Sequence, residues 1–458
     1  MTLPGAVALN MLDMIGVGPF ITLPLLLAAM GGPQAMLGWI FGALLALADG
    51  LVWAELAGMM PEAGGSYRFL REMFPGSTGR FLGFLFCFQL MFSAPLSMAS
   101  GCIGLAQYAG YLWPGLRGHT WIWGRLVAGP ATAVAVGCVV AVTLLLYRRL
   151  ANLRLISYAL WGAVLATIAW VLVTGVLFGQ WKLVTTLPPG AFHLNGAFFA
   201  GLASAMLIAT YDFWGYYNVA FLAGEVRDAA RNVPRAILLS IGIVSVLYVA
   251  MNTALLALVP WQTQLGAHDL NAREALVSYV MEAAYGARFG PGVGLWAGRA
   301  AALLVMVTAF GSVFSLLLGY SRIPFAAARD GNFFRAFGKL HPRGGFPYVS
   351  LLYLAGAAGL FCFLSLGEVI AALVVLRIVV QFLLQHVGVM ALRRTQAERA
   401  RPFRMLLYPL PPLLALAGFV YILVARTDSA RQLWMAAGVV VLGAAVYRLR
   451  GLFSVSQA

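Results

Sequence analysis

Charged residues are scarce in this chain of 458 residues: they make up 10% of it, whereas hydrophobic residues make up 62%. A soluble protein carries roughly 25% charged and about 45–50% apolar residues, so the composition indicates a membrane protein. Cysteine is also rare. The four cysteines fall in apolar segments, at spacings that suit neither a metal site nor a disulfide framework, and we expect them to be small core residues.

Catalytic and metal-binding clusters are missing as well. The five histidines are scattered along the chain, so the sequence predicts no metal site and no cofactor. No Gly-x-x-x-x-Gly-Lys-Ser/Thr loop for nucleotide hydrolysis is present. A membrane-embedded enzyme would need catalytic polar residues gathered at membrane depth, and the sequence offers no such group. We therefore expect a protein that is not an enzyme.

Long apolar segments are what the chain has in quantity. A segment of about 20 apolar residues spans a bilayer. Twelve such segments are predicted, near residues 5–30, 36–59, 79–112, 125–147, 152–179, 198–223, 235–260, 294–324, 347–366, 368–391, 404–426 and 431–449. The first segment is preceded by no basic region and followed by no small-residue cleavage site, so we expect it to be retained.

The net charge of +15 is unevenly distributed. With the N-terminus placed in the cytoplasm, most of the 30 lysines and arginines fall in cytoplasmic loops and the C-terminal tail, including the cluster at 393–404. This positive-inside pattern predicts a multi-pass protein of the plasma (inner) membrane with both termini in the cytoplasm. The lipid bilayer accounts for the basic excess, so no nucleic-acid partner is expected. The sequence leaves a partner subunit open.

The first apolar segment is interrupted by Gly16, Gly18 and Pro19, in the stretch MIGVGPF. At membrane depth, irregular backbone survives only where protein or a water-filled cavity surrounds it. Proline cannot continue a helix, but it suits the first turn of a new one. One interpretation is a half-helix over about 5–15, an unwound joint, and a second half-helix from about residue 19. The alternative is a kinked helix whose glycines allow close packing.

A second interruption favours the joint over the kink. The sixth segment contains ATYDFWGYYN (209–218), and each interruption lies in the first helix of a block of five. Paired interruptions at corresponding places in two halves are typical of transporters built from inverted repeats. The sequence thus predicts a single transmembrane domain over 1–458, with repeats at 5–180 and 198–391 and two C-terminal helices within 404–449.

Five motifs, in this order, resemble the amino acid–polyamine–organocation superfamily of secondary transporters. They are GVGPF with Pro24, AELAGMMPEAGGSYRFL (54–70), GEVRDAARNVPRAI (224–237), SRIPFAAARDGNFFRAFGKLHPRGGFP (321–347) and RPFRMLLYPL (401–410). The resemblance implies an all-α membrane protein with the twelve-helix leucine-transporter fold. It also implies an amino acid or a close relative as substrate, held between the joints of the first and sixth helices.

The chain departs from the family pattern in two places. Pro19 removes one amide donor from the expected carboxylate cradle. Many sodium-independent members carry a lysine in the fifth helix that substitutes for a sodium ion, and the fifth segment of this chain has none. The coupling ion, proton or sodium, is therefore left open.

The candidate substrate site follows from the two joints. We expect amides of the first joint to hold the substrate carboxylate, and carbonyls near Ile15 and Tyr211 to face its ammonium group. The amides are those of Val17, Gly18 and Phe20. The complete predicted set is Ile15, Gly16, Val17, Gly18, Phe20, Tyr211, Asp212, Phe213, Trp214 and Gly215. Asp212 either caps the restarted half-helix, which we favour, or meets a cation or the coupled proton.

Three residues are gate candidates. The resemblance implies that an aromatic beside the second joint closes over the substrate from outside, and Tyr211 is the candidate. The functional interpretation of Tyr67 is that it covers the inner pathway, and that of Glu225 is that it joins an ion-pair network that holds the inner gate shut. The alternatives are an interfacial aromatic for Tyr67 and a solvated loop for Glu225. Ser312 and Ser315 in the eighth helix could complete a cation site with the first joint, although a helical serine more often bonds back to its own preceding turn.

Four further ionisable residues lie at or near membrane depth: Asp49, Glu55, Glu368 and Arg377. Such residues usually face the interior and pair, and Glu368 and Arg377 are too far apart along their helix to pair with each other. Together these features predict a secondary active amino acid transporter (a permease) that works by alternating access, with neutral amino acids favoured. The alternatives are a polyamine or cationic amino acid carrier and, from another class, a membrane channel.

Overall fold

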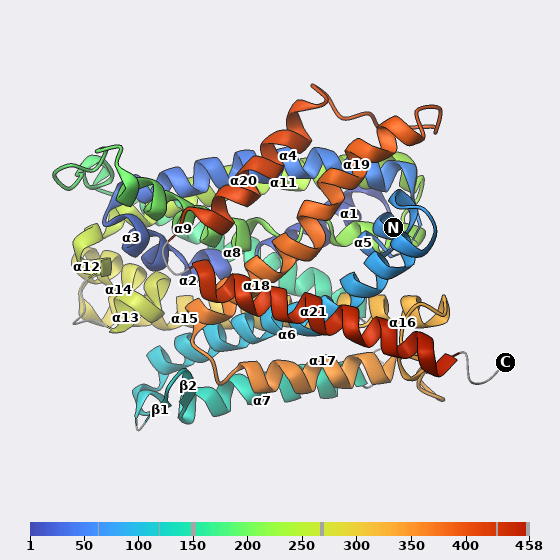
Figure 1. Ribbon diagram of the computed structural model, residues 1–458. Coiled ribbons are helices and arrows are strands. Elements are labelled where there is room, and N and C mark those ends of the chain that lie inside the picture. The colour runs from blue at the N-terminus through green and yellow to red at the C-terminus, as the bar shows by residue number, and fades with distance from the viewer. Residues whose placement is uncertain (63, 119, 148–152, 266–269, 427–428, 455–458) are drawn as a thin grey trace.

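The computed structural model of the chain describes residues 1–458 except 63, 119, 148–152, 266–269, 427–428 and 455–458. It is almost entirely helical (Figure 1). Within the described residues, ten helices are long and apolar enough to cross a membrane. They are Leu3–Ile21, Pro33–Met59, Gly76–Leu112, Pro130–Tyr147, Ala159–Phe178, Gly196–Phe213, Ala229–Leu258, Pro291–Arg329, Leu366–Thr395 and Ser429–Leu449. The chain is therefore a multi-pass membrane protein.

Two shorter apolar helices, Tyr348–Phe361 and Leu410–Val424, lie where the sequence predicts the ninth and eleventh spans. The α-helices in chain order are α1 (Leu3–Met14), α2 (Gly18–Ile21), α3 (Leu23–Met30), α4 (Met36–Met59), α5 (Ser66–Met73), α6 (Gly76–Leu112), α7 (Pro130–Tyr147), α8 (Leu153–Phe178), α9 (Gly196–Phe213), α10 (Asn218–Phe221), α11 (Ala229–Leu258), α12 (Trp261–Leu265), α13 (Leu270–Glu274), α14 (Leu276–Phe289), α15 (Pro291–Tyr320), α16 (Arg322–Arg329), α17 (Tyr348–Phe361), α18 (Leu366–Arg377), α19 (Leu383–Thr395), α20 (Leu410–Val424) and α21 (Ser429–Ser454). Short 3-10 turns join several of them, at Pro33–Ala35, Pro114–Arg117, Trp181–Thr185, Ala223–Glu225 and Arg335–Gly338, and a π-helical turn, Ile378–Phe382, joins α18 to α19.

The interruption predicted in the first segment is confirmed. Helix α1 ends at Met14, residues 15–17 are not helical, and α2 begins at Gly18 with Pro19 in its first turn. The chain breaks again at Thr22, before α3, which carries Pro24 in its first turn. Proline has no amide hydrogen to give to a preceding turn, so each proline marks a helix start. We call residues 15–17 the first joint.

The second interruption is also present, but it is shorter than the predicted stretch 209–218. Helix α9 continues through Phe213, residues 214–217 form turns, and α10 begins at Asn218. Asp212 therefore belongs to the last turn of α9. Gly215 has a φ of +123°, which favours glycine, and a side chain there would meet the backbone of α1. We call residues 214–217 the second joint.

One predicted boundary is wrong. The fourth segment was expected from residue 125, but the chain forms a hairpin there, with strands β1 (Trp121–Trp123) and β2 (Leu126–Ala128), and α7 begins at Pro130. Gly124 makes the tight turn with a φ of +62°. The apolar residues of this hairpin had extended the apparent span. Trp121 and Trp123 are 73% and 86% exposed, as is typical of aromatics near a membrane interface.

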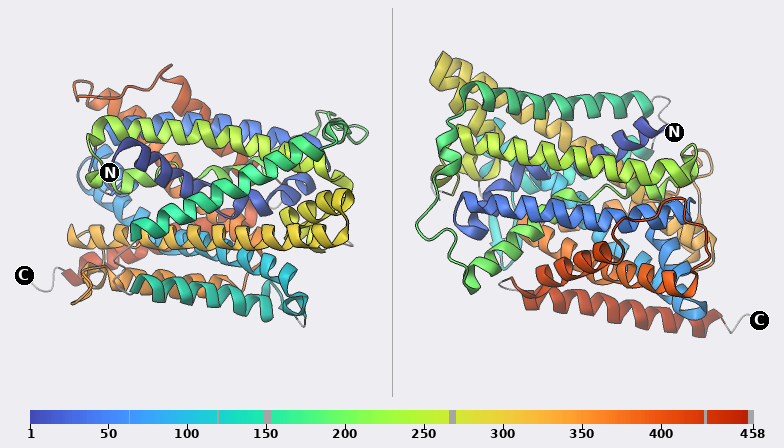
Figure 2. Two further views of the ribbon diagram at one scale, coloured as in Figure 1. Left: turned by 180° about the vertical axis from the view of Figure 1, so that it is seen from behind. Right: turned by 90° about the horizontal axis from the view of Figure 1, so that it is seen from above.

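The interrupted helices lie inside the bundle. Helix α1 contacts α11 and α15, and α9 contacts α4, α3 and α18. Helix α6 is the most enclosed span, with 83% of its apolar window buried, whereas 17% is buried in the C-terminal span. The N-terminus and the C-terminal end of α21 lie at the same end of the bundle, towards α5 and α16 (Figures 1 and 2).

Candidate functional site

Side chains from neighbouring helices satisfy the backbone that the two joints leave free. The Tyr248 hydroxyl, on α11, lies 2.5 Å from the Met14 carbonyl and 3.1 Å from the Asp212 carbonyl, so it is within hydrogen-bond distance of both interrupted helices. The Asn10 side chain donates to the Tyr216 carbonyl at 2.5 Å and accepts from the Val219 amide at 3.0 Å. The joints are therefore fixed against each other, as irregular backbone at membrane depth requires.

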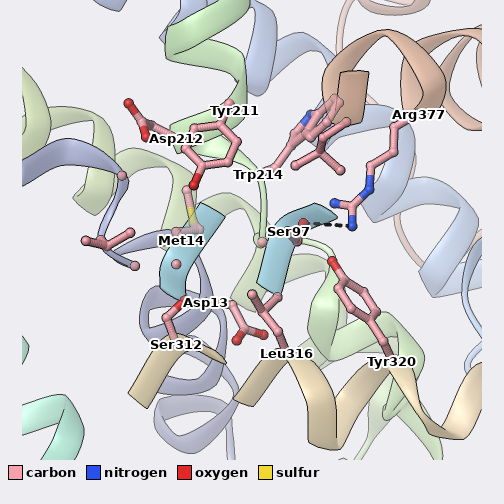
Figure 3. Close-up of a pocket in the computed structure, with 16 residues that line it drawn as sticks. Asp13, Met14, Ser97, Tyr211, Asp212, Trp214, Ser312, Leu316, Tyr320 and Arg377 are labelled. Carbon is pink, nitrogen blue, oxygen red and sulfur yellow. Dashed lines mark hydrogen bonds between the residues drawn. The ribbon is translucent and has the colours of Figure 1, made fainter. Parts of the chain in front are cut away.

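A cavity of about 40 Å³ lies between the joints (Figure 3). That is room for only a few water molecules, so the joints must separate for a larger molecule to enter. The cavity is lined by Asp13, Met14, Gly16, Val17, Gly18, Ser97, Gly101, Tyr211, Asp212, Trp214, Gly215, Ser312, Leu316, Tyr320, Leu373 and Arg377. These residues come from both joints, from the adjoining helices α1, α2 and α9, and from α6, α15 and α18.

The structure brings together seven of the ten predicted substrate-site residues. Ile15, Phe20 and Phe213 do not line the cavity. The Phe20 amide donates to the Val17 carbonyl at 3.1 Å, and its carbonyl accepts from Tyr108. Phe213 packs between Trp39 and Tyr248. Of the three predicted amide donors, those of Val17 and Gly18 remain open within the described part of the chain.

Glycine is needed at the first joint for space. Neither Gly16 nor Gly18 has a positive φ, so conformational freedom is not what selects glycine there. A Cβ at Gly16 would lie 2.7 Å from Ser312 Oγ, and a Cβ at Gly18 would lie 1.9 Å from Asp212 Oδ1. Any side chain at Gly18 would thus displace the Asp212 carboxylate.

Asp212 links the end of α9 to the break between α2 and α3, and it does not cap α10. Its Oδ2 accepts a hydrogen bond of 2.6 Å from the hydroxyl of Thr22, the residue between α2 and α3. Its Oδ1 has no partner among the described residues. The N-cap of α10 is Tyr217, which makes no side-chain cap, so the favoured capping role of Asp212 is wrong. Its side chain is 2% exposed, so this oxygen is a buried acceptor.

Arg377, near the end of α18, is a buried cation on the cavity wall, 3% exposed. It donates to the Tyr217 hydroxyl at 2.9 Å and to Ser97 Oγ at 3.1 Å, the latter contact dashed in Figure 3. It also lies over the rings of Trp214 and Tyr320, at 5.5 and 5.2 Å. Among the described residues no carboxylate lies within ion-pair distance of it.

The expectation that Glu368 and Arg377 do not pair is confirmed. Glu368 pairs instead with Arg125, at 3.3 Å, and with Arg431. Asp49 and Glu55 face the interior as predicted, since neither is exposed.

Asp13 is the acidic cavity residue that sequence reasoning missed. It lies in the last turn of α1, two residues before the joint, and an acid at membrane depth was the available signal. Ser312 lines the cavity beside Gly16, as the predicted cation site requires, whereas Ser315 interacts with the Asp13 carboxylate. The cavity therefore carries two acids and one base, and none of the three forms an ion pair within the described residues. Figure 3 shows Asp212 and Arg377 on opposite sides of Tyr211.

Each predicted gate residue contacts a neighbouring segment of the bundle. The Tyr211 hydroxyl donates to Ser100 Oγ on α6 at 2.8 Å. At the end that carries the termini, Glu225 pairs with Arg322 at the start of α16. This pair borders a second cavity of about 430 Å³. The partner of Glu225 is thus the helix that follows α15, and not the basic residues that follow Glu225 in sequence.

Tyr67 joins α5 to the end of α16. It is 2% exposed, its hydroxyl lies 3.2 Å from Asp330 Oδ2, and Arg71 pairs with the same carboxylate at 2.7 Å. Burial raises the pKa of Tyr67, so its hydroxyl stays a neutral donor. A buried tyrosine between two ion-pair partners is a better gate candidate than an interfacial aromatic.

Helix α5 is fixed to the loop that follows α19 by a further carboxylate, that of Glu72, which pairs with Arg399. Partial burial alone would raise the pKa of Glu72, but hydrogen bonds and charges of Arg399 and Arg68 outweigh it and hold that pKa below its usual value. The depressed pKa means that the contribution to stability is present above the unfolded-state pKa. It is lost as the pH falls through the folded-state value.

Known proteins can be compared with this geometry. The chain matches the amino acid permease family over residues 2–445. It belongs to that family. It is 25% identical to the serine/threonine exchanger SteT of Bacillus subtilis over 419 residues, which cover 89% of this chain and 86% of SteT.

Two further relatives match over most of their length. An uncharacterised transporter of Mycobacterium bovis is 28% identical over 454 residues, covering 96% of this chain and 88% of that protein. The branched-chain amino acid permease BcaP of Bacillus subtilis is 25% identical over 407 residues, covering 85% of this chain and 80% of BcaP. The resemblance to the amino acid–polyamine–organocation superfamily is therefore confirmed, and the family is one of transporters.

Proposed function

We propose that this permease is a secondary active transporter that carries neutral amino acids across the plasma membrane by alternating access. The observation that carries the proposal is the cavity between two helix joints, lined by polar groups from both. Membership of the amino acid permease family supports it, and so do the printed cargoes of SteT and BcaP, which are neutral amino acids.

The proposal includes a twelve-helix arrangement of two inverted five-helix repeats followed by α20 and α21. Ten long spans, two shorter apolar helices and interruptions at the first helix of each block support this arrangement. Both termini face the cytoplasm in the proposal, because the basic residues of α5 and α19 gather at the end of the bundle that carries the termini.

The cavity suggests how a zwitterion is held. The open amides of Val17 and Gly18 are available to a carboxylate, and carbonyls of the joints together with Asp212 to an ammonium group. The rest of the cavity is lined by Arg377 together with Ser97, Trp214 and Tyr320. The side chain of a bound amino acid would therefore extend towards Arg377. A positive charge at that end disfavours polyamines and cationic amino acids.

Uptake by the purified protein in liposomes tests the proposed function. We expect radiolabelled serine or leucine to enter faster when the liposomes contain unlabelled cargo, because a carrier returns faster when it is loaded. A channel would show no such stimulation by internal cargo. Absence of stimulated uptake across a panel of the neutral amino acids would overturn the proposal.

Arg377 is predicted to exclude cationic cargo. Lysine should compete poorly for uptake by the wild type, because its side chain would meet a buried like charge. In Arg377→Gln we expect the apparent affinity for lysine to rise at least about tenfold, which corresponds to roughly 1.4 kcal/mol. Arg377→Lys keeps the charge and should keep the exclusion. Equal competition by lysine in the wild type would favour the cationic carrier instead.

A further inference from the structure

A second group of buried ionisable side chains lies beside the second joint, and it is not part of the cavity lining. It consists of Asp49 on α4, His386 on α19 and Tyr216 in the joint itself, which are 0%, 0% and 1% exposed. The Tyr216 hydroxyl donates to Asp49 Oδ2, and His386 Nε2 lies 3.2 Å from Asp49 Oδ1. Three separate elements thus meet at one carboxylate at membrane depth.

The hydrogen bonds of His386 fix where its protons lie. Its Nδ1 is 2.6 Å from the Phe382 carbonyl, which can only accept, so Nδ1 carries a hydrogen. The neutral ring then has a lone pair on Nε2, pointed towards a carboxylate oxygen. Neither Nε2 nor Asp49 Oδ1 has another hydrogen-bond partner in the described part of the chain. One additional proton turns this acceptor–acceptor contact into an ion pair, and its loss leaves two buried acceptors facing each other.

We propose that Asp49 and His386 form a proton-binding site whose occupation is linked to the movement of the second joint, so that amino acid uptake is coupled to protons. The inference rests on the proposed transport function. When the pair holds its proton, it ties α19 to α4 and, through Tyr216, to the joint. When the proton leaves, two buried acceptors face each other, so α19 separates more easily from α4 and from the second joint, while Tyr216 keeps its hydrogen bond to Asp49.

The chain connects this site to the cavity over one peptide unit. Tyr216 donates to Asp49, while the next residue, Tyr217, accepts from Arg377 on the cavity wall. A displacement of the joint therefore changes both contacts at once. That link is what coupling needs, because each ligand must bias the same two-state element. A proton site here would also allow ion coupling without a lysine in the fifth helix, which has none.

The described side chains that contact the pair or Tyr216 from other elements are neutral. Helix α11 contributes Ser240 and α1 contributes Asn10, both hydrogen-bonded near Tyr216, and α20 contributes the ring of Phe419 against His386. Helix α5 meets α19 through Ser66 and Gln385. The nearest other titratable groups are Tyr217 with Arg377, and Glu55 with Arg393 further along α4 and α19. Asp49 and His386 are therefore the groups that bind the proton in this proposal.

Proteoliposomes loaded at neutral pH and placed in acidic buffer test the proposal. We expect the wild type to accumulate labelled serine or leucine several-fold above the level without a gradient, and a sodium gradient of equal size to have no such effect. A pH dye inside the liposomes should report proton entry with the cargo. In His386→Gln both gradient-driven accumulation and cargo-linked proton entry should be lost, while exchange of labelled for unlabelled cargo persists.

His193→Gln is the matched control, because His193 lies in an exposed loop, and it should behave as the wild type. Asp49→Asn is the second variant, and it should show the same split between gradient-driven uptake and exchange. If His386→Gln is not recovered as a monodisperse protein, Asp49→Asn provides the same test.

Three results would overturn the inference. One is exchange by the wild type with no response to a pH gradient, which leaves the transport function intact. Another is full gradient-driven uptake by both variants. The third is an equal loss of exchange and gradient-driven uptake in well-folded variants, which would make the pair a purely structural contact. Failure of exchange in the wild type would instead overturn the transport function itself.

Discussion

Gly18→Leu is expected to reduce amino acid uptake to background while the protein still inserts and folds. The Cβ of any side chain at this position would lie 1.9 Å from Asp212 Oδ1, 3.0 Å from Asp212 Cγ and 3.2 Å from the Tyr211 ring. Asp212 cannot simply rotate away, because its other oxygen accepts from Thr22. Leucine would also fill the space beside the open amides of Val17 and Gly18.

Gly18→Ala gives a graded version of the same test. Overpacking of this kind costs about 1–3 kcal/mol, so a loss of roughly tenfold in apparent affinity is expected for alanine. Uptake in liposomes and cargo binding to the detergent-purified protein would be measured for both variants. Gly137→Leu is the control, since that glycine lies in α7 with open space around its Cβ. Normal uptake by Gly18→Leu would show that the first joint is a kink and not a binding site.

The two joints were predictable because their signals are local. Gly16, Gly18 and Pro19 fall within four residues, and a proline that starts a helix is visible without any tertiary contact. The neighbours of the glycines were not predictable: the structure shows that Asp212 and Ser312 occupy the space that a side chain at Gly18 or Gly16 would need. That reason depends on residues from α9 and α15, far away in sequence.

The contact partners of the buried charged residues were also not predictable, because they too are far away in sequence. Sequence reasoning placed Asp49 and Arg377 in the interior, because ionisable residues at membrane depth are costly unless they are enclosed. It could not pair Asp49 with His386, or Arg377 with Tyr217 and Ser97, because those contacts join residues hundreds of positions apart. Asp13 was overlooked because a single acid at the end of an apolar helix does not stand out as part of a cavity until α15 is packed against it.

The C-terminal end of α4 carries one carboxylate that contacts three segments of the chain. Glu55, at 0% exposure on α4, accepts from Arg393 Nε at 2.8 Å and from the Met405 amide at 2.8 Å. Arg401 Nε lies 3.5 Å from the same group. The Arg393 guanidinium also lies 4.0 Å above the ring of Tyr408. This carboxylate thus anchors α4 to α19 and to the loop that leads into α20.

Glu55→Gln is therefore expected to be strongly destabilising. Glutamine keeps the shape of the side chain but removes the charge, which leaves Arg401, 6% exposed, and Arg393, 20% exposed, against a neutral amide. Breaking a buried ion pair in this way costs about 3–5 kcal/mol, because the remaining charge loses its partner without regaining water. Glu62→Gln is the matched control: it also removes a carboxylate from an arginine, Arg68, but that Glu62 side chain is 62% exposed. Such a surface pair contributes about 0–1 kcal/mol.

Thermal unfolding of the purified variants in detergent, followed by tryptophan fluorescence, should show a clearly lower melting temperature for Glu55→Gln and a nearly unchanged one for Glu62→Gln. Equal melting temperatures would mean that water reaches the Glu55 cluster and that the three segments are held together by apolar packing alone.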